Sequence, residues 1–137
     1  IHDHISSFAS KVIYGSLKNE FYESNDESKN YILKKFKSVG NCCTPSRHEL
    51  EEMQSLEFLR EETLEAGQSY FLKYDQLHRL VPKSDELVTL IIQDTPIDRE
   101  INVYRHATDE TYRSESAIPI PEMNFQNIFS RLENLIG

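Results

Sequence analysis

The chain has 137 residues, of which 38% are apolar and 28% charged, a composition typical of globular proteins. Its 23 acidic and 15 basic residues give a formal net charge of −8. This charge argues against nucleic-acid binding as the main task, because that binding depends on lysines and arginines that neutralise phosphates. No apolar run approaches the ~20 residues that a membrane-spanning helix needs. The sequence therefore predicts a single domain over 1–137.

The first part of the chain, 1–82, reads as helical. A capping-box pair, Ser24 and Glu27, separates a helix over about 4–22 from a second helix over about 25–39, which Gly40 ends. The first of these helices is predicted from apolar residues that recur at three- and four-residue intervals. This stripe consists of Ile5, Phe8, Ala9, Val12, Ile13, Leu17 and Phe21.

A third helical segment is predicted over about 46–81. It begins at a second capping-box pair, Ser46 and Glu49, and Pro82 ends it because proline cannot continue the helical hydrogen bonding. Gly67 interrupts the apolar pattern, so the segment is either one long helix or two helices joined there.

Glutamates dominate the first half of this third segment. A solvated helix face explains them, and so does a surface that attracts a basic protein partner. For the second interpretation we single out Glu51, Glu57 and Glu61 as candidate partner-binding residues.

The second part, 83–137, reads as three strands and a helix. Alternating apolar residues and turn residues predict an antiparallel meander over about 86–93, 99–106 and 111–118, covered by a helix over 122–136 with Phe129 at the centre of its apolar face. The fold class is therefore predicted as α+β. This order of elements resembles the globular ends of kinetochore-type subunits with an RWD fold; the resemblance concerns element order and implies no site residues.

The two cysteines, Cys42 and Cys43, are adjacent. A disulfide between neighbouring residues is strained, so we predict free thiols and a reducing compartment, the cytoplasm or the nucleus. Zinc binding would need further ligands, and His48 is the one near in sequence, so no metal or cofactor is predicted there. A cysteine nucleophile paired with His48 or His78 is an equally weak reading. The chain begins at Ile1 rather than at methionine, so we expect a processed or excised piece.

Two other groups of residues were considered for chemistry. His2-Asp3-His4 has metal-ligand character, but at a terminus we attribute it to chance. Carboxylates beside the predicted hairpin near 94–100, Asp94, Asp98 and Glu100, are typical of a Mg²⁺ site and give the alternative of a metal-dependent hydrolase or nuclease.

The function predicted from the sequence is therefore binding to another protein, as an adaptor or complex subunit without catalytic activity. Two alternatives stay open beside it: the metal-dependent hydrolase and a structural subunit that associates with itself as a homo-oligomer.

Overall fold

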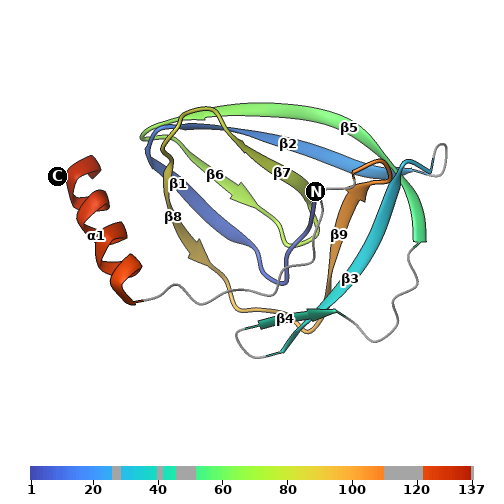
Figure 1. Ribbon diagram of the computed structural model, residues 1–137. Coiled ribbons are helices and arrows are strands. Elements are labelled where there is room, and N and C mark those ends of the chain that lie inside the picture. Colours follow the sequence, from blue (N-terminus) through green and yellow to red (C-terminus); the bar gives the residue numbers. More distant parts are fainter. Residues whose placement is uncertain (26–28, 40–41, 46–51, 110–121, 137) are drawn as a thin grey trace.

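The fold is mostly β. The computed structural model describes residues 1–25, 29–39, 42–45, 52–109 and 122–136 (Figure 1). Within these ranges the chain forms nine strands and one helix: β1 (Phe8–Tyr14), β2 (Ser16–Asn25), β3 (Tyr31–Val39), β4 (Cys42–Pro45), β5 (Glu52–Glu65), β6 (Ser69–Leu72), β7 (Leu77–Pro82), β8 (Val88–Gln93), β9 (Glu100–His106) and α1 (Glu122–Ile136).

The strands form two antiparallel sheets. One has the order β6-β1-β8, and the other has the order β4-β3-β5-β2-β7 with β9 paired to β3. Two pairs of strands continue from one sheet into the other: β1 leads into β2 through Gly15, and β5 leads into β6 through a turn at Gly67. Both glycines have positive φ, 78° and 90°, a conformation that disfavours residues with a Cβ atom.

The N-terminal segment closes the second sheet into a barrel. His2 forms antiparallel bridges with His78 of β7 on one side and with Val103 of β9 on the other. The neighbours therefore form a ring that runs β2-β7-(1–3)-β9-β3-β5-β2. Figure 1 shows the N-terminus lying between β7 and β9, where this ring closes.

The core lies where the two sheets meet. Residues of β1, β2, β5 and β6 fill it, and their alternation along each strand places every second side chain inside. The cluster consists of Phe8, Val12, Leu17, Phe21, Leu64, Tyr70 and Leu72.

The prediction of N-terminal helices is wrong. Where the structure describes the segments expected to be helices, 4–22, 25–39 and 46–81, they form β1, β2, β3, β5, β6 and β7 instead. Phe8 and Val12 are buried, and Ser10 between them is buried as well, while Ala9 and Lys11 are exposed. That is the period of two of a strand. A spacing of four suits both a helix and a strand, so Phe8 and Val12 fit either reading.

The α+β class and the predicted meander are also wrong, although three segments of 83–137 carry the expected secondary structure: β8, β9 and α1. β8 pairs with β1 and β9 pairs with β3, so the two strands lie in different sheets and take partners from 8–14 and 31–37. The expected strand over 111–118 lies outside the described residues. The RWD-like order of elements is therefore not found in this structure.

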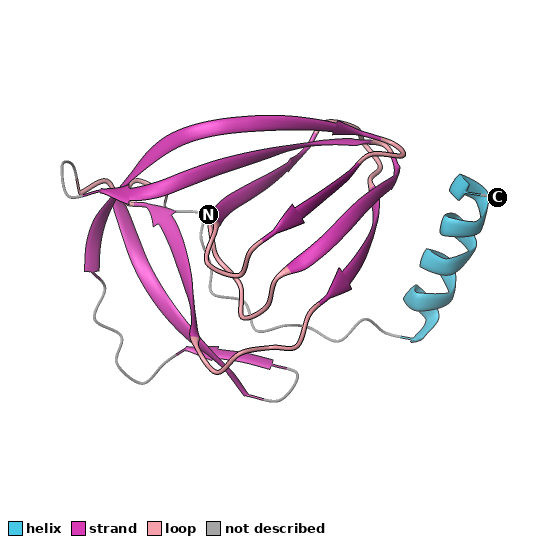
Figure 2. Ribbon diagram, turned by 180° about the vertical axis from the view of Figure 1, so that it is seen from behind, coloured by secondary structure: helices cyan, strands magenta, loops and turns pink. Residues whose placement is uncertain are grey.

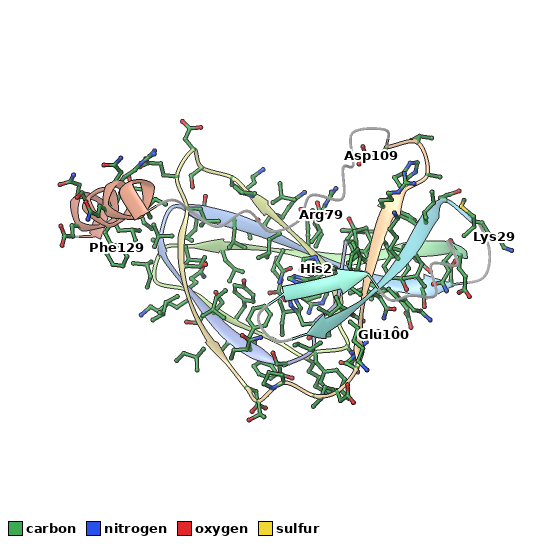
Figure 3. All side chains as sticks on the ribbon, turned by 60° about the horizontal axis from the view of Figure 1, so that its bottom comes forward. His2, Lys29, Arg79, Glu100, Asp109 and Phe129 are labelled. Carbon is green, nitrogen blue, oxygen red and sulfur yellow. The ribbon has the colours of Figure 1, made fainter. Side chains whose placement is uncertain are left out.

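α1 lies to one side of the strands rather than over a sheet face (Figure 2). Arg131 of α1 forms an ion pair with Glu86, which lies just before β8. The apolar side chains Ile128 and Phe129 of the helix are about half exposed, at 42% and 52%. Phe129 lies on the helix, away from the strands that hold His2 (Figure 3). No helix in the described ranges combines the length and apolar character that crossing a membrane requires.

A candidate metal centre

Three histidines meet where the barrel closes. His2 and His4 come from the N-terminal segment and His78 comes from β7, and their ligand nitrogens all lie within 4.8 Å of one another. Side chains two residues apart on an extended segment share a face, which places His2 and His4 together and Asp3 on the opposite face. The backbone pairing of His2 with His78 then brings the third ring to the same place.

The three rings are in contact with one another. Their centroids lie 4.8 Å apart for His2 and His4, 4.9 Å for His2 and His78, and 5.0 Å for His4 and His78. The Nε2 atoms of His4 and His78 are 2.8 Å apart, so one of these nitrogens donates a hydrogen to the other. The side chains are therefore held in contact before any ion binds.

Asn19 orients the most buried of the three rings. Its Oδ1 lies 2.9 Å from His78 Nδ1, and both side chains are buried. An amide oxygen accepts a hydrogen bond, so Nδ1 of His78 carries the proton and Nε2 keeps its lone pair for the centre of the cluster. Among the described residues, the Asn19 amide nitrogen has no hydrogen-bond partner.

The histidines are held in their neutral form. Burial, and then the charges of neighbouring groups such as His4, lower the pKa of His2 to about 4. Burial, followed by the charges of His2 and His4, lowers the pKa of His78 to about 3, and burial also lowers the pKa of His4. Neutral imidazoles are the form that ligates metals, so the cluster needs little deprotonation near pH 7.

Apolar and charged groups surround the cluster on different sides. The ring of Phe8 contacts His4 edge-on, with centroids 4.9 Å apart, and Tyr70 continues this apolar wall behind Phe8. On the other face of the N-terminal segment, the Asp3 carboxylate pairs with Arg99. Within the part of the chain that the structure describes, no carboxylate joins the three histidines in the cluster.

The donor set and its spacing fit a tetrahedral metal ion. Zinc binds imidazole nitrogens at about 2.0–2.1 Å, which places two of its ligand nitrogens about 3.3 Å apart. The separations of the ligand nitrogens, 2.8 Å between His4 and His78 and at most 4.8 Å within the cluster, lie on either side of that value. Three protein ligands leave a fourth position for water or another small ligand.

A second buried cluster surrounds Glu20 on β2. Its carboxylate, 6% exposed, pairs with Arg79 and Lys18 and accepts a hydrogen bond from Tyr22. Burial acts to raise the pKa of Glu20, but these three hydrogen bonds and the Arg79 charge outweigh it and lower the pKa to about 2. The partners of Glu20 belong to β2 and β7, and Lys18 also pairs with Glu61 of β5, so this cluster joins neighbouring strands of one sheet.

The structure separates the glutamates proposed to bind a partner. Glu61 pairs with Glu20 across the β2–β5 ladder and Glu57 pairs with Glu23. Since Glu20 and Glu23 are three residues apart on one strand, Glu57 and Glu61 point to opposite faces of the sheet. A single acidic helix face is therefore not formed, and Glu51 lies outside the described residues. Their role in partner binding stays a prediction.

The other candidate residues do not gather. Asp98 pairs with Lys37 at 3.8 Å, Asp94 accepts a hydrogen bond from the Thr95 amide, and within the described ranges the three histidines are the one group with metal-site spacing. The hydrolase site at 94–100 stays a prediction without a ligand cluster. Cys42 and Cys43 lie in β4, and His48 lies outside the described residues.

Sequence reasoning considered His2 and His4 but missed their association with His78 and Asn19. His4 and His78 are 74 residues apart, and no local motif connects them. Comparisons with protein-family models, with curated proteins and with solved structures find no match to this chain.

Proposed function

We propose that the chain binds a divalent transition-metal cation through His2, His4 and His78, with zinc as the reference ion. The observation that supports this most directly is the convergence of three imidazole rings, whose ligand nitrogens lie within 4.8 Å of one another, where the barrel closes. A chance cluster of surface histidines would not include a ring as buried as His78, nor the hydrogen bond that directs its Nε2 inward.

The donor chemistry selects the class of ion. Imidazole nitrogens suit zinc, copper, nickel and iron, whereas Mg²⁺ and Ca²⁺ prefer oxygen ligands, and the cluster offers none. Three neutral ligands also leave the full charge of the ion uncompensated, which favours water, hydroxide or a small anion at the fourth position.

Metal titration of purified, metal-free protein tests this proposal. We expect one zinc ion per chain by calorimetry or chelator competition, and the intense visible bands of four-coordinate cobalt when Co²⁺ replaces zinc. His4→Gln should weaken zinc binding by at least about 10-fold, the lower end of what losing even an outer partner of a ligand costs.

His106→Gln provides the matched control. His106 is exposed, and its ring contacts Thr108 rather than the cluster. It should bind zinc like the wild-type chain. Equal zinc affinity in His4→Gln, His106→Gln and the wild type would show that zinc binds elsewhere and would overturn the proposal.

A second candidate function, association with another copy of the chain, is supported by β8. This strand carries no charged residue, and among the described strands it pairs on one edge only, with β1. Leu90, Ile91 and Ile92 are each more than half exposed, at 58%, 52% and 71%. Two chains of net charge −8 would meet with least repulsion along an uncharged edge, and antiparallel self-pairing keeps two-fold symmetry.

Light scattering coupled to size exclusion tests this association. We expect a dimer that Ile91→Lys converts to a monomer, because a buried lysine at the paired edge is unfavourable. A wild-type chain that stays monomeric at its highest soluble concentration would exclude it. With two adjacent cysteines and no others, location in the cytoplasm or nucleus remains part of the proposal.

A further inference from the structure

The N-terminal segment supplies two of the three metal ligands and one part of the barrel wall. Its backbone is hydrogen-bonded to β7, because the amides of His2 and His78 each donate to the other residue's carbonyl at 3.0 Å. It is bonded to β9 through the Asp3 amide, which donates to the Asn102 carbonyl at 3.1 Å, and through the Ile1 carbonyl, which accepts from Tyr104 at 2.7 Å. Undocking this segment would open the barrel and remove His2 and His4 together.

Asp3 anchors this segment from the face opposite the histidines. Its carboxylate is 3% exposed and accepts hydrogen bonds from Arg99 Nη2 at 2.6 Å, from the Asn102 amide at 2.7 Å and from Asn102 Nδ2 at 2.7 Å. Arg99 in turn donates to the Tyr74 carbonyl. A buried carboxylate with this many partners holds one position of the backbone between the two ligands.

We propose that Asp3 is the positioning residue of the metal centre, and that a bound metal ion locks the N-terminal segment into the barrel wall between β7 and β9. This inference rests on the proposed metal binding. Because the docked segment carries two ligands and β7 carries the third, docking assembles the site and binding favours docking. The two processes share one coupling free energy, so each strengthens the other by the same factor.

The coupling predicts that a residue without metal contact controls metal affinity. Asp3→Asn keeps the shape of the side chain and an oxygen for Asn102 but weakens the pair with Arg99. We expect this variant to bind zinc about 10–100-fold more weakly, the range measured for outer partners of metal ligands. Arg99→Gln, which removes the other half of the pair, should have a similar effect and serves if Asp3→Asn does not fold.

Glu20→Gln is a closely matched control. Among the described residues, Glu20 is a second buried carboxylate with an arginine partner, also at 2.6 Å, and its hydrogen-bond and ion-pair partners lie in β2 and β7. Its substitution should reduce thermal stability, as Asp3→Asn should, yet leave zinc affinity within about 2-fold of the wild type, because neighbouring residues of a strand point to opposite faces and Glu20 lies on the face away from Asn19 and His78. This control separates positioning of ligands from general destabilisation.

Hydrogen exchange measured by mass spectrometry provides a readout besides affinity. Zinc should slow exchange in peptides that cover the N-terminal segment, β7 and β9, and should leave β8 unchanged. In Asp3→Asn without zinc, the backbone amides of the N-terminal segment should exchange faster than in the wild type. In Glu20→Gln they should exchange at the wild-type rate.

The outcomes distinguish the two proposals. A wild-type chain that binds no zinc refutes the metal function, and the inference with it. A wild-type chain that binds zinc through His4, while Asp3→Asn and Arg99→Gln bind it equally well, refutes the positioning role alone. Protection by zinc that does not extend to β9 refutes the locking of the segment.

Discussion

Gly15→Ala should destabilise the protein, and the sign of its effect discriminates the observed strands from the predicted helix. In a helix interior, alanine is more stable than glycine by about 0.8–1.0 kcal/mol. In the structure, Gly15 lies between β1 and β2 with φ of 78°, and a Cβ there would overlap the Glu86 carbonyl oxygen and the Ser84 hydroxyl.

The magnitude follows from three contributions. The left-handed conformation costs a residue with a Cβ about 1–2 kcal/mol. Displacing the backbone around Glu86 adds about 1–3 kcal/mol, as overpacking does in cores, and it disturbs the hydrogen bonds of the Ser84 hydroxyl to Ser16 and Glu86. Alanine also has less conformational freedom than glycine in the unfolded chain, which offsets the loss of stability by about 0.4–1 kcal/mol. We therefore expect a net loss of about 2–4 kcal/mol from the free energy of unfolding.

Urea denaturation followed by circular dichroism measures this loss, and Gly67→Ala is its control. Gly67 also has positive φ, 90°, but no atom lies within 4 Å of a Cβ built there. It should lose about 1 kcal/mol, the conformational part alone. A Gly15→Ala protein that is more stable than the wild type would refute the left-handed bend between β1 and β2 and restore the helical interpretation.

Two further predictions concern packing and pH. Leu72→Ala should lower the free energy of unfolding by about 2–5 kcal/mol in the same assay, because Leu72 is fully buried. Phe129→Ala should lower it by less than about 1 kcal/mol, since Phe129 is 52% exposed. An equal loss in the two variants would contradict the peripheral place of α1. The depressed pKa of Glu20, about 2 against an ordinary value of 4.5, means that its ionised form stabilises the fold above pH 4.5 and that this contribution disappears as the pH falls toward 2. The stability difference between wild type and Glu20→Gln should therefore shrink over that interval; a difference that stays constant between pH 5 and pH 2 would show that the Glu20 carboxylate does not contribute through its charge.

Apolar residues that recur three and four positions apart allowed two interpretations of the first half of the chain, as helices or as strands. Leu17 and Phe21 are core residues in the structure, and a spacing of four places them together on a helix or on a strand. The deciding position is Asn19, midway between them, which a helix would place away from the core and which the structure buries completely. The apolar residues alone fit both the helical period of 3.6 and the strand period of two. The polar residues between them carry the distinction, and the helix prediction did not use them.

The segment that forms β5 was predicted as a helix for a different reason. Glutamate and leucine favour helices, and the segment offers little apolar alternation, with Ser55 and Leu64 as its buried residues. Its strand conformation is set by partners remote in sequence, β2 along its length and β3 at its start. Long-range pairing overrides local preference here, and a single sequence does not reveal that pairing.

The second half was more predictable for a local reason. β8 is dense in β-branched residues and α1 has an amphipathic pattern that suits a helix but not a strand, so each element follows from its own residues. What local pattern could not provide was the partner of each strand. The meander expected between β8 and β9 required them to pair with each other, and both pair with strands that had been read as helices.

The candidate metal centre could have been predicted through the same buried asparagine, Asn19. In a strand reading, Asn19 lies between Leu17 and Phe21 on the interior face, and a buried amide requires a polar partner from a neighbouring strand. In the ladder that joins β2 to β7, Asn19 pairs with Leu80 and Phe21 pairs with His78, so the ring of His78 faces inward two positions along from Asn19. His78 then needs a hydrogen-bond donor or a cation for its Nε2, and the barrel places the extended segment with His2 and His4 against it. A polar residue at an interior strand position is therefore the signal that connects the fold of this chain to its candidate site.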